Sequence, residues 1–270
     1  MTSSSLTHAA DDLLHEVVAA VTDAAAVLLD RYSPHARAVA PDGIVAEIHA
    51  NDAAVVEGLR SRLLAARPGS QWAEDELAGG ALPDGEWWIV DPVEGNINHV
   101  HGMDEWAVTA TLVSDNRPVL TVVQLPLTGD TYTAVAGRGA LLNSVPLQVS
   151  RKTDLKAALT GTGQARPGES HETFRKIGES VTAMLVNGLL VRVSVPATLQ
   201  LIHVAAGRMD AFWQFSDVRS GLVAGALLVA EANGAVTDIS GAPWTLASPD
   251  FLAAAPGIHT AAAGVLASIA

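Results

Sequence analysis

The sequence contains no cysteine, which excludes disulfides, thiolate metal sites and cysteine nucleophiles. Aromatic residues make up only 4% of a chain that is 49% apolar, so the core must be built mainly from alanine and branched aliphatic side chains. Basic residues are scarce too, with 16 Lys and Arg against 29 Asp and Glu. Because sequence-independent nucleic-acid binding depends on Lys and Arg, we expect no nucleic-acid partner and instead a small diffusible substrate.

Long apolar runs are also missing. No run reaches the roughly 18 to 20 residues that span a bilayer, and residues 1–5 show no basic region leading into an apolar one, as a signal peptide would. We therefore expect a cytoplasmic protein with no membrane partner. The 270 residues are enough for one large domain, or for two subdomains packed closely together.

The spacing of apolar residues predicts an order of helices and strands. An amphipathic helix is expected over residues 7–32, a loop over 33–43, and a second helix that begins with Asn51 or Asp52 as its N-cap and ends at Pro68. Residues 87–149 look β-rich, with turns at Asp115-Asn116 and Asn143-Ser144. Strands and helices alternate from 155 to 269, beginning with a strand over 155–162. A single domain of 1–270, with halves of about 1–150 and 151–270, is therefore predicted to be an α+β or layered α/β body.

The stretch 87–98, WWIVDPVEGNIN, carries the clearest chemical signal. An apolar run leads into Asp91, and a turn with Glu94 and Gly95 follows. Two carboxylates three residues apart at the end of a buried strand are costly unless a cation compensates their charge. Because Mg²⁺ prefers oxygen ligands, this stretch predicts a divalent-cation site.

Several segments of the chain resemble the inositol monophosphatase family. Residues 88–98 resemble its signature W-I-x-D-P-(I/L)-D-G-T-x-N, and residues 217–218 with 231–234 resemble its second signature, W-D-x-A-A-G followed by E-A-G-G. Segments 73–75, 137–143 and 207–211 fall in family order, so the resemblance extends from about Leu13 to the C-terminus. It implies a layered α/β/α/β/α sandwich of the inositol monophosphatase and fructose-1,6-bisphosphatase type, a homodimer, and Mg²⁺-dependent hydrolysis of small phosphate monoesters.

The resemblance also implies roles for individual residues. A first metal would be held by Glu74, Asp91 and the carbonyl of Val93, and a second by Asp91, Glu94 and Asp217. Asp52 and Asn96 would activate the attacking water, with Glu74 also counted among the catalytic groups. The amides of Gly95 and Asn96 would face the phosphate at a helix start. Four further positions are expected near the substrate: Gln164, Ala197, Gln214 and Arg219.

Three departures from the family pattern fall at the site itself. Glu94 stands for an aspartate, and because Mg²⁺ requires near-ideal octahedral geometry, the longer side chain could favour a more tolerant ion such as Mn²⁺. Asn96 stands for a threonine, and its amide oxygen could replace the hydroxyl as an acceptor from water. Asn51 stands for the threonine before Asp52. In the substrate loop, Gln214 aligns with an acid and Arg219 replaces a small residue.

These departures leave several interpretations open. The substrate could be a sugar, nucleoside, cyclitol or amino-alcohol phosphate from a biosynthetic pathway; the enzyme could instead eliminate or cyclise phosphate, or the chain could bind ligand without turnover. Asp52 could be a helix cap, and Asp217 an ordinary charge at a helix start. Arg219 could contact substrate or pair with an acid. His99 is expected to be a packing variant rather than a metal ligand with His101, since hard cations prefer oxygen.

Overall fold

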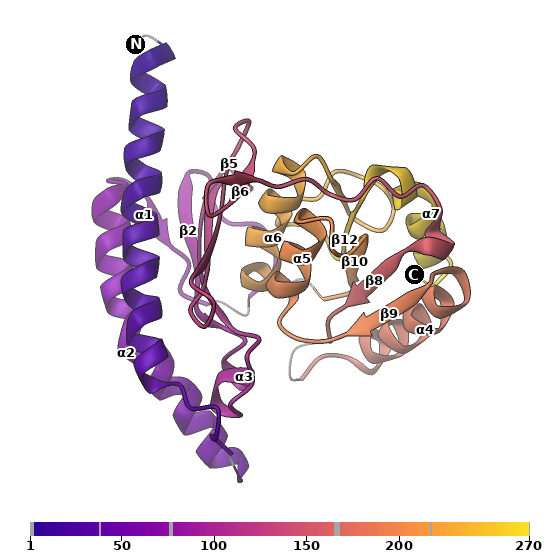
Figure 1. The fold of residues 1–270 in the computed structure, drawn as a ribbon, viewed down its shortest axis with the longest axis horizontal. Coiled ribbons are helices and arrows are strands. Elements are labelled where there is room, and N and C mark those ends of the chain that lie inside the picture. The colour runs from indigo at the N-terminus through magenta and orange to yellow at the C-terminus, as the bar shows by residue number, and fades with distance from the viewer. Residues whose placement is uncertain (1–2, 38, 76–77, 165–167, 217, 270) are drawn as a thin grey trace.

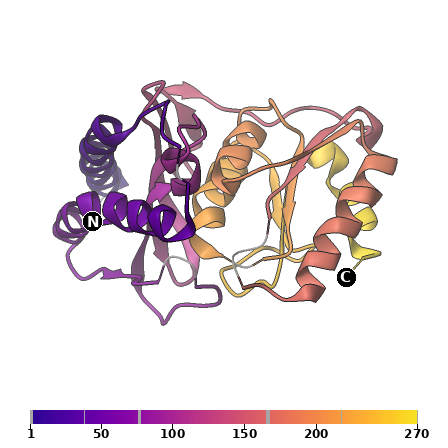
Figure 2. The ribbon, with the colours of Figure 1, turned by 90° about the horizontal axis from the view of Figure 1, so that it is seen from below.

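The computed structural model describes residues 3–37, 39–75, 78–164, 168–216 and 218–269. Two sheets alternate with helices in five layers (Figure 1 and Figure 2). One outer layer holds α1 (Ser3–Arg31) and α2 (Pro41–Ala66), the central layer holds α5 (Ala197–Ala205) and α6 (Arg219–Glu231), and the other outer layer holds α4 (His171–Asn187) and α7 (Pro256–Ala267). This is the predicted α/β/α/β/α sandwich. None of the described helices is both long and apolar enough to cross a membrane.

The sheet beside α1 and α2 is a meander of seven strands in chain order. The β1–β2 pair is parallel and the remaining pairs are antiparallel. Left-handed residues at Asp115-Asn116 and Asn143-Ser144 close two tight hairpins, as the sequence predicts. The strands are β1 (Gln71–Trp72), β2 (Glu86–Glu94), β3 (Ala107–Ser114), β4 (Arg117–Leu125), β5 (Asp130–Val135), β6 (Ala140–Leu142) and β7 (Val145–Pro146).

The second sheet has the order β11-β12-β10-β8-β9 and mixes strand directions. β8 pairs in parallel with β9 and β10, whereas β12 runs antiparallel to β10 and β11. A short 3-10 helix at Leu155–Ala157, capped by Asp154, occupies the start of a segment predicted as strand from 155. The strands are β8 (Leu159–Thr162), β9 (Leu190–Val193), β10 (Ala211–Gln214), β11 (Ala235–Thr237) and β12 (Phe251–Ala254).

Small residues allow the central helix layer to pack tightly between the two sheets. Ten residues of α6, from Arg219 to Val229, are buried. A Cβ on Gly225 would lie only 2.3 Å from the Cβ of Leu201, so glycine lets α6 approach α5 closely. This agrees with the prediction of a core rich in small and branched side chains.

The start of α2 corrects one prediction. The helix begins at Pro41 and runs through Asn51 and Asp52, so neither residue is its N-cap. Proline is tolerated in the first helical turn because its missing N–H would have no intrahelical acceptor there, and here it opens the helix instead of marking a loop. As a result, Asn51 and Asp52 are interior helical residues whose side chains reach α3 (Asn96–Val100).

Candidate active site

The carboxyl end of β2 is bent by a β-bulge. Asp91 pairs with Thr109 and Glu94 with Ala107, so three steps along β2 match two along β3. The backbone N–H of Val93 donates to Oδ1 of Asp91 at 3.1 Å, and that of Asp91 donates to the Thr109 hydroxyl at 3.3 Å. The bulge therefore ends the sheet pairing at the two predicted metal-binding carboxylates.

Glu94 lies in the interior rather than at the surface, with 4% of it exposed. The hydroxyl of Thr198, in the first turn of α5, donates to Oε2 of Glu94 at 2.9 Å. This contact links the end of β2 to the central helix layer. A buried carboxylate is costly unless hydrogen bonds or cations compensate its charge.

Gly95 and Asn98 fix the turn that follows. Gly95 is left-handed, with φ 83°, and a Cβ there would lie 2.7 Å from the carbonyl oxygen of Glu105. The Asn98 side chain then donates to the carbonyls of Glu105 at 2.7 Å and Val195 at 3.0 Å. These contacts hold α3 against the loop before α5, so its first amides stay at the end of β2.

Asp52 and Asn96 are brought together as predicted. Nδ2 of Asn96 donates to Oδ1 of Asp52 at 2.8 Å and to the carbonyl of Ile48 at 3.1 Å. Its Oδ1 accepts from Nδ2 of Asn51 at 3.0 Å, so the amide oxygen expected to face a water is directed toward α2 instead. Burial raises the pKa of the Asp52 carboxyl, while the Asn96 hydrogen bond and nearby His49 lower it in part.

Glu74 has a different partner from the predicted one. Its carboxylate forms a two-bond ion pair with the guanidinium of Arg60 on α2, at 2.6 and 3.1 Å, and its side chain is 69% exposed. Arg60 is also held over the ring of Trp72, with Cζ 5.9 Å from the centroid. Within the described parts of the chain, no three acidic or histidine side chains converge as a metal site. Asp217, a predicted ligand of the second metal, lies outside the described residues.

The predicted substrate residues fall into two groups. Gln164 is exposed and lines a cavity of about 270 Å³ with Asn98, and Ala197 begins α5 nearby. Gln214 and Arg219 are buried, as is Ala197. Gln214 lies at the end of β10, and Arg219 donates to the carbonyls of Gly79 and Gly80, which anchors the segment after Glu74.

Two other family-like segments meet away from this site. Both carboxylate oxygens of Glu231, at the end of α6, accept backbone N–H groups of Gly137 and Gly139 at 2.8 Å. One carboxylate therefore holds a tight turn of the first sheet against the central helix layer.

The sequence did not point to Arg31, Arg60 or Thr198, and it gave Asn51 a different role. Each acts through a partner 14 to 104 positions away in the chain, which no local pattern reveals. His99 behaves as predicted: it is buried and its ring lies edge-on to Trp106, with centroids 4.7 Å apart. His101 instead contacts the carbonyl of Ile97 through Nδ1.

A sequence profile of the inositol monophosphatase family matches residues 9–269. The chain belongs to this family. It is 36% identical to an inositol-1-monophosphatase of Rhizobium meliloti over 184 residues, covering 68% of each chain. It is also 36% identical to the Nus factor SuhB of Pseudomonas aeruginosa over 154 residues, which span only 57% of this chain and 57% of that protein. A solved inositol monophosphatase from Anabaena superposes with a TM-score of 0.79, at 25% identity and covering 95% and 96% of the two chains.

Family membership confirms the resemblance and the sandwich fold. The roles of the individual residues at the end of β2 stay predictions, and the relatives carry two different names.

Proposed function

We propose that this chain hydrolyses a small phosphate monoester with Mg²⁺ or Mn²⁺ as its cofactor. The observation that carries the proposal is the bulged end of β2, where the carboxylates of Asp91 and Glu94 immediately precede the left-handed Gly95 that opens α3. Asp52 is hydrogen-bonded to the first residue of the same helix. The donor set consists of oxygen atoms, which suits a hard divalent cation.

Asp91, the Val93 carbonyl and Glu94, together with Glu74 and Asp217, would hold the cations. Bound divalent cations stabilise the negative charge that develops on the attacking and leaving oxygens. Because Arg60 engages both carboxylate oxygens of Glu74, cation binding at Glu74 would compete with the Arg60–Glu74 ion pair.

The remaining chemistry belongs to α2 and α3. The amides of Gly95 and Asn96 would donate to phosphate oxygens, since the first N–H groups of a helix have no intrahelical acceptor. Asp52 would accept the proton of the attacking water on the oxygen that Asn96 does not occupy. Burial raises the pKa of Asp52 toward the range of a useful general base. Gln164 and Ala197, near the cavity beside Asn98, would contact the organic part of the substrate.

A phosphate-release assay over sugar, nucleoside, cyclitol and amino-alcohol phosphates tests the proposal. Release should require Mg²⁺ or Mn²⁺ and should fall at least about 100-fold in Asp91→Asn, the range seen when a group acting on the transition state is removed. Asp12→Asn, on the exposed face of α1, is the matched control. Solvent ¹⁸O should enter the released phosphate; its absence from the products would indicate elimination or cyclisation. No release from any substrate with either metal would overturn the proposal.

A second candidate is binding without turnover. It is favoured by the exposed two-bond pair between Arg60 and Glu74, which occupies a predicted metal ligand. Calorimetric titration with Mn²⁺, in the presence and absence of inorganic phosphate, separates the two. A chain that takes up Mn²⁺ with phosphate but releases none from the panel would be a binding protein.

We also propose a homodimer formed through the edge of the second sheet. β9 is an edge strand, and the end of α4 and the turn that leads into β9 expose apolar side chains, Val186 at 70% and Leu189 at 66%. A second copy would remove this surface from water. Sedimentation should show a dimer that Leu189→Asp weakens, whereas a wild-type monomer at micromolar concentration would contradict it.

A further inference from the structure

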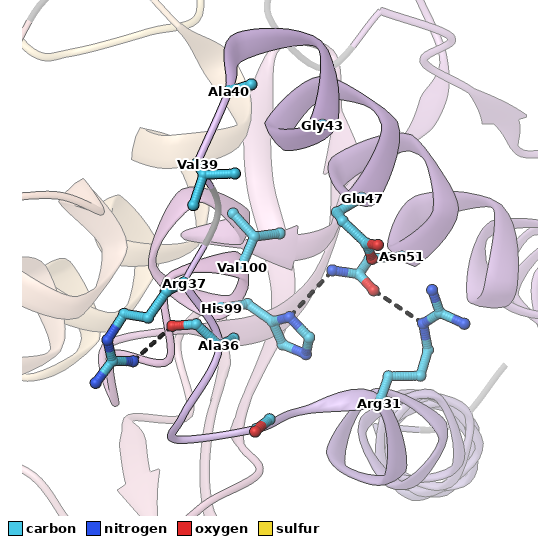
Figure 3. A pocket seen from close by; sticks show the side chains of 11 residues that line it. Arg31, Ala36, Arg37, Val39, Ala40, Gly43, Glu47, Asn51, His99 and Val100 are labelled. Carbon is cyan, nitrogen blue, oxygen red and sulfur yellow. Dashed lines mark hydrogen bonds between the residues drawn. The ribbon is translucent and has the colours of Figure 1, made fainter.

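A chain of hydrogen bonds joins the last residue of α1 to Asp52. Nε of Arg31 donates to Oδ1 of Asn51 at 2.8 Å, and Nδ2 of Asn51 lies 3.0 Å from both Oδ1 of Asn96 and Nδ1 of His99. Asn51 is only 2% exposed. In Figure 3, Arg31 and His99 flank Asn51 at the wall of a cavity of about 420 Å³, with Glu47 one helical turn before it.

The groups at the ends of this hydrogen-bond network determine which way the side chains between them are oriented. The carbonyl of Leu28 can only accept, so Nε2 of His99, 3.2 Å away, carries the hydrogen. Burial lowers the pKa of His99, so the ring is neutral and its Nδ1 accepts. Arg31 can only donate, which directs the oxygen of Asn51 toward it. The Asn51 amide nitrogen therefore faces its two acceptors, His99 and Asn96.

The same reasoning fixes the amide of Asn96. Its oxygen receives the Asn51 N–H, and its nitrogen faces the carbonyl of Ile48 and the carboxylate of Asp52, both of which are acceptors. Reversing the Asn96 amide would place its oxygen against these two oxygens and its nitrogen against the Asn51 nitrogen. All three contacts would then be repulsive, so Asn51 determines which atom Asn96 presents to Asp52.

We propose that Asn51 is a positioning residue for Asp52: held by Arg31 and His99, it locks Asn96 so that an N–H, rather than an oxygen, faces the carboxylate. The locked N–H fixes one carboxylate oxygen of Asp52 and stabilises its charged form, which leaves the other oxygen to accept a proton. The catalytic consequence rests on the proposed hydrolysis, whereas the orientation of the amides does not.

Asn51→Asp tests the proposal with almost no change of shape. An oxygen replaces the amide nitrogen, so Oδ1 of Asn96 loses its donor and faces an acceptor, and the Asn96 amide is no longer locked against Asp52. We expect kcat to fall about 10- to 100-fold, as for a lost hydrogen bond to a charged group, with KM nearly unchanged. The acid limb of the pH–rate profile should move to higher pH. Asn187→Asp, at the end of α4, adds the same charge elsewhere and should have neither effect.

Arg31→Lys is a second variant for the event that Asn51→Asp fails to fold, because Arg31 is exposed. It keeps the positive charge but loses the Nε donor that holds the Asn51 oxygen. We expect a change in the same direction and smaller than that of Asn51→Asp. Normal kcat and an unmoved pH profile in both variants would overturn the proposal.

A double-variant cycle measures the coupling between Asn51 and Asn96. Threonine at both positions restores the residue pair of the family resemblance. Either single threonine leaves the remaining asparagine without the amide to which it is hydrogen-bonded. Asn51→Thr and Asn96→Thr should each lower kcat, and the double variant should lose at least about 10-fold less than the product of the single losses. Multiplicative losses would show that the two residues act independently.

A readout that needs neither metal nor substrate is ¹⁵N NMR of the imidazole of His99. The wild-type protein should show the neutral form with hydrogen on Nε2, and Asn51→Asp should show a ring protonated on both nitrogens, paired with the new carboxylate. Hydrogen on Nδ1 in the wild type would overturn the network. If the wild type releases no phosphate, the proposed function fails while this measurement still decides the network; if it releases phosphate and both Asn51→Asp and Arg31→Lys are normal, only the positioning role of Asn51 fails.

Discussion

The ion pair between Arg60 and Glu74 predicts an unusual effect: removal of a surface arginine should strengthen metal binding. Glu74 is the predicted ligand that the structure finds engaged elsewhere, with 2.6 Å between Nη2 of Arg60 and Oε1 of Glu74. The Glu74 side chain is 69% exposed and that of Arg60 37%, so solvent screens the pair. Exposed pairs contribute about 0.2 to 1 kcal/mol. Because about 1.4 kcal/mol is tenfold in affinity, Arg60→Gln should tighten Mn²⁺ binding by no more than about 5-fold.

Titration calorimetry of the apoprotein with Mn²⁺ measures this effect directly. Arg62→Gln is a close control, since it breaks an ion pair between α2 and Asp23 in which the side chains are 39% and 75% exposed. The difference between the variants should shrink at about 0.5 M salt, where charges on the surface are screened over a few ångströms. Equal affinities in the two variants, or weaker binding in Arg60→Gln, would refute the idea that Glu74 is a metal ligand held in competition.

Three further outcomes follow from the site and the core. Gly95→Ala should destabilise the protein more than Gly137→Ala in urea unfolding: both positions have positive φ, at a cost of about 1 to 2 kcal/mol, but only Gly95 is crowded by backbone. Thr198→Val keeps the shape but removes a hydrogen bond from buried Glu94, so we expect a loss of about 1 to 3 kcal/mol, and an unchanged unfolding midpoint would contradict that role. Burial lowers the pKa of His259 in the folded protein below its ordinary value of 6.5. Between the two values the unfolded chain binds more protons than the folded one, so the free energy of unfolding should fall on acidification from pH 7.5 to 5.5. The fall should be smaller in His259→Gln.

The features that the sequence predicts well are those set by near neighbours. Hairpin turns at Asp115-Asn116 and Asn143-Ser144 follow from residues that tolerate left-handed backbone, and the sandwich follows from a meander half and an alternating half. The start of α2 was misplaced because Pro41 serves equally well in a loop or as the first residue of a helix. Only the packing of the helix distinguishes the two.

The candidate active site likewise has local features that the sequence predicts and long-range contacts that it does not. Gly95 and the order of the acids around it can be recognised from one short stretch, because a bulge and a left-handed turn are local structures. The partners of those acids cannot be recognised from the sequence. Arg60 and Arg62 lie two positions apart on α2 and look alike in the sequence, yet one pairs with Glu74 and the other with Asp23 of α1. The rotation of α2 about its axis, set by its packing on α1 and the sheet, makes that choice.

Asn51 and Asn96 look in the sequence like two separate departures from a family pattern, but hydrogen-bond chemistry makes them one. A threonine hydroxyl can donate and accept at the same atom, whereas an amide divides these roles between nitrogen and oxygen. Once Asn96 turns its nitrogen toward Asp52, its oxygen needs a donor, which Asn51 supplies. Asn51 then needs a donor for its own oxygen and an acceptor for its second N–H, which Arg31 and His99 supply. Because a half-satisfied buried network is costlier than either complete arrangement, any one of these residues changed alone should be worse than the set changed together.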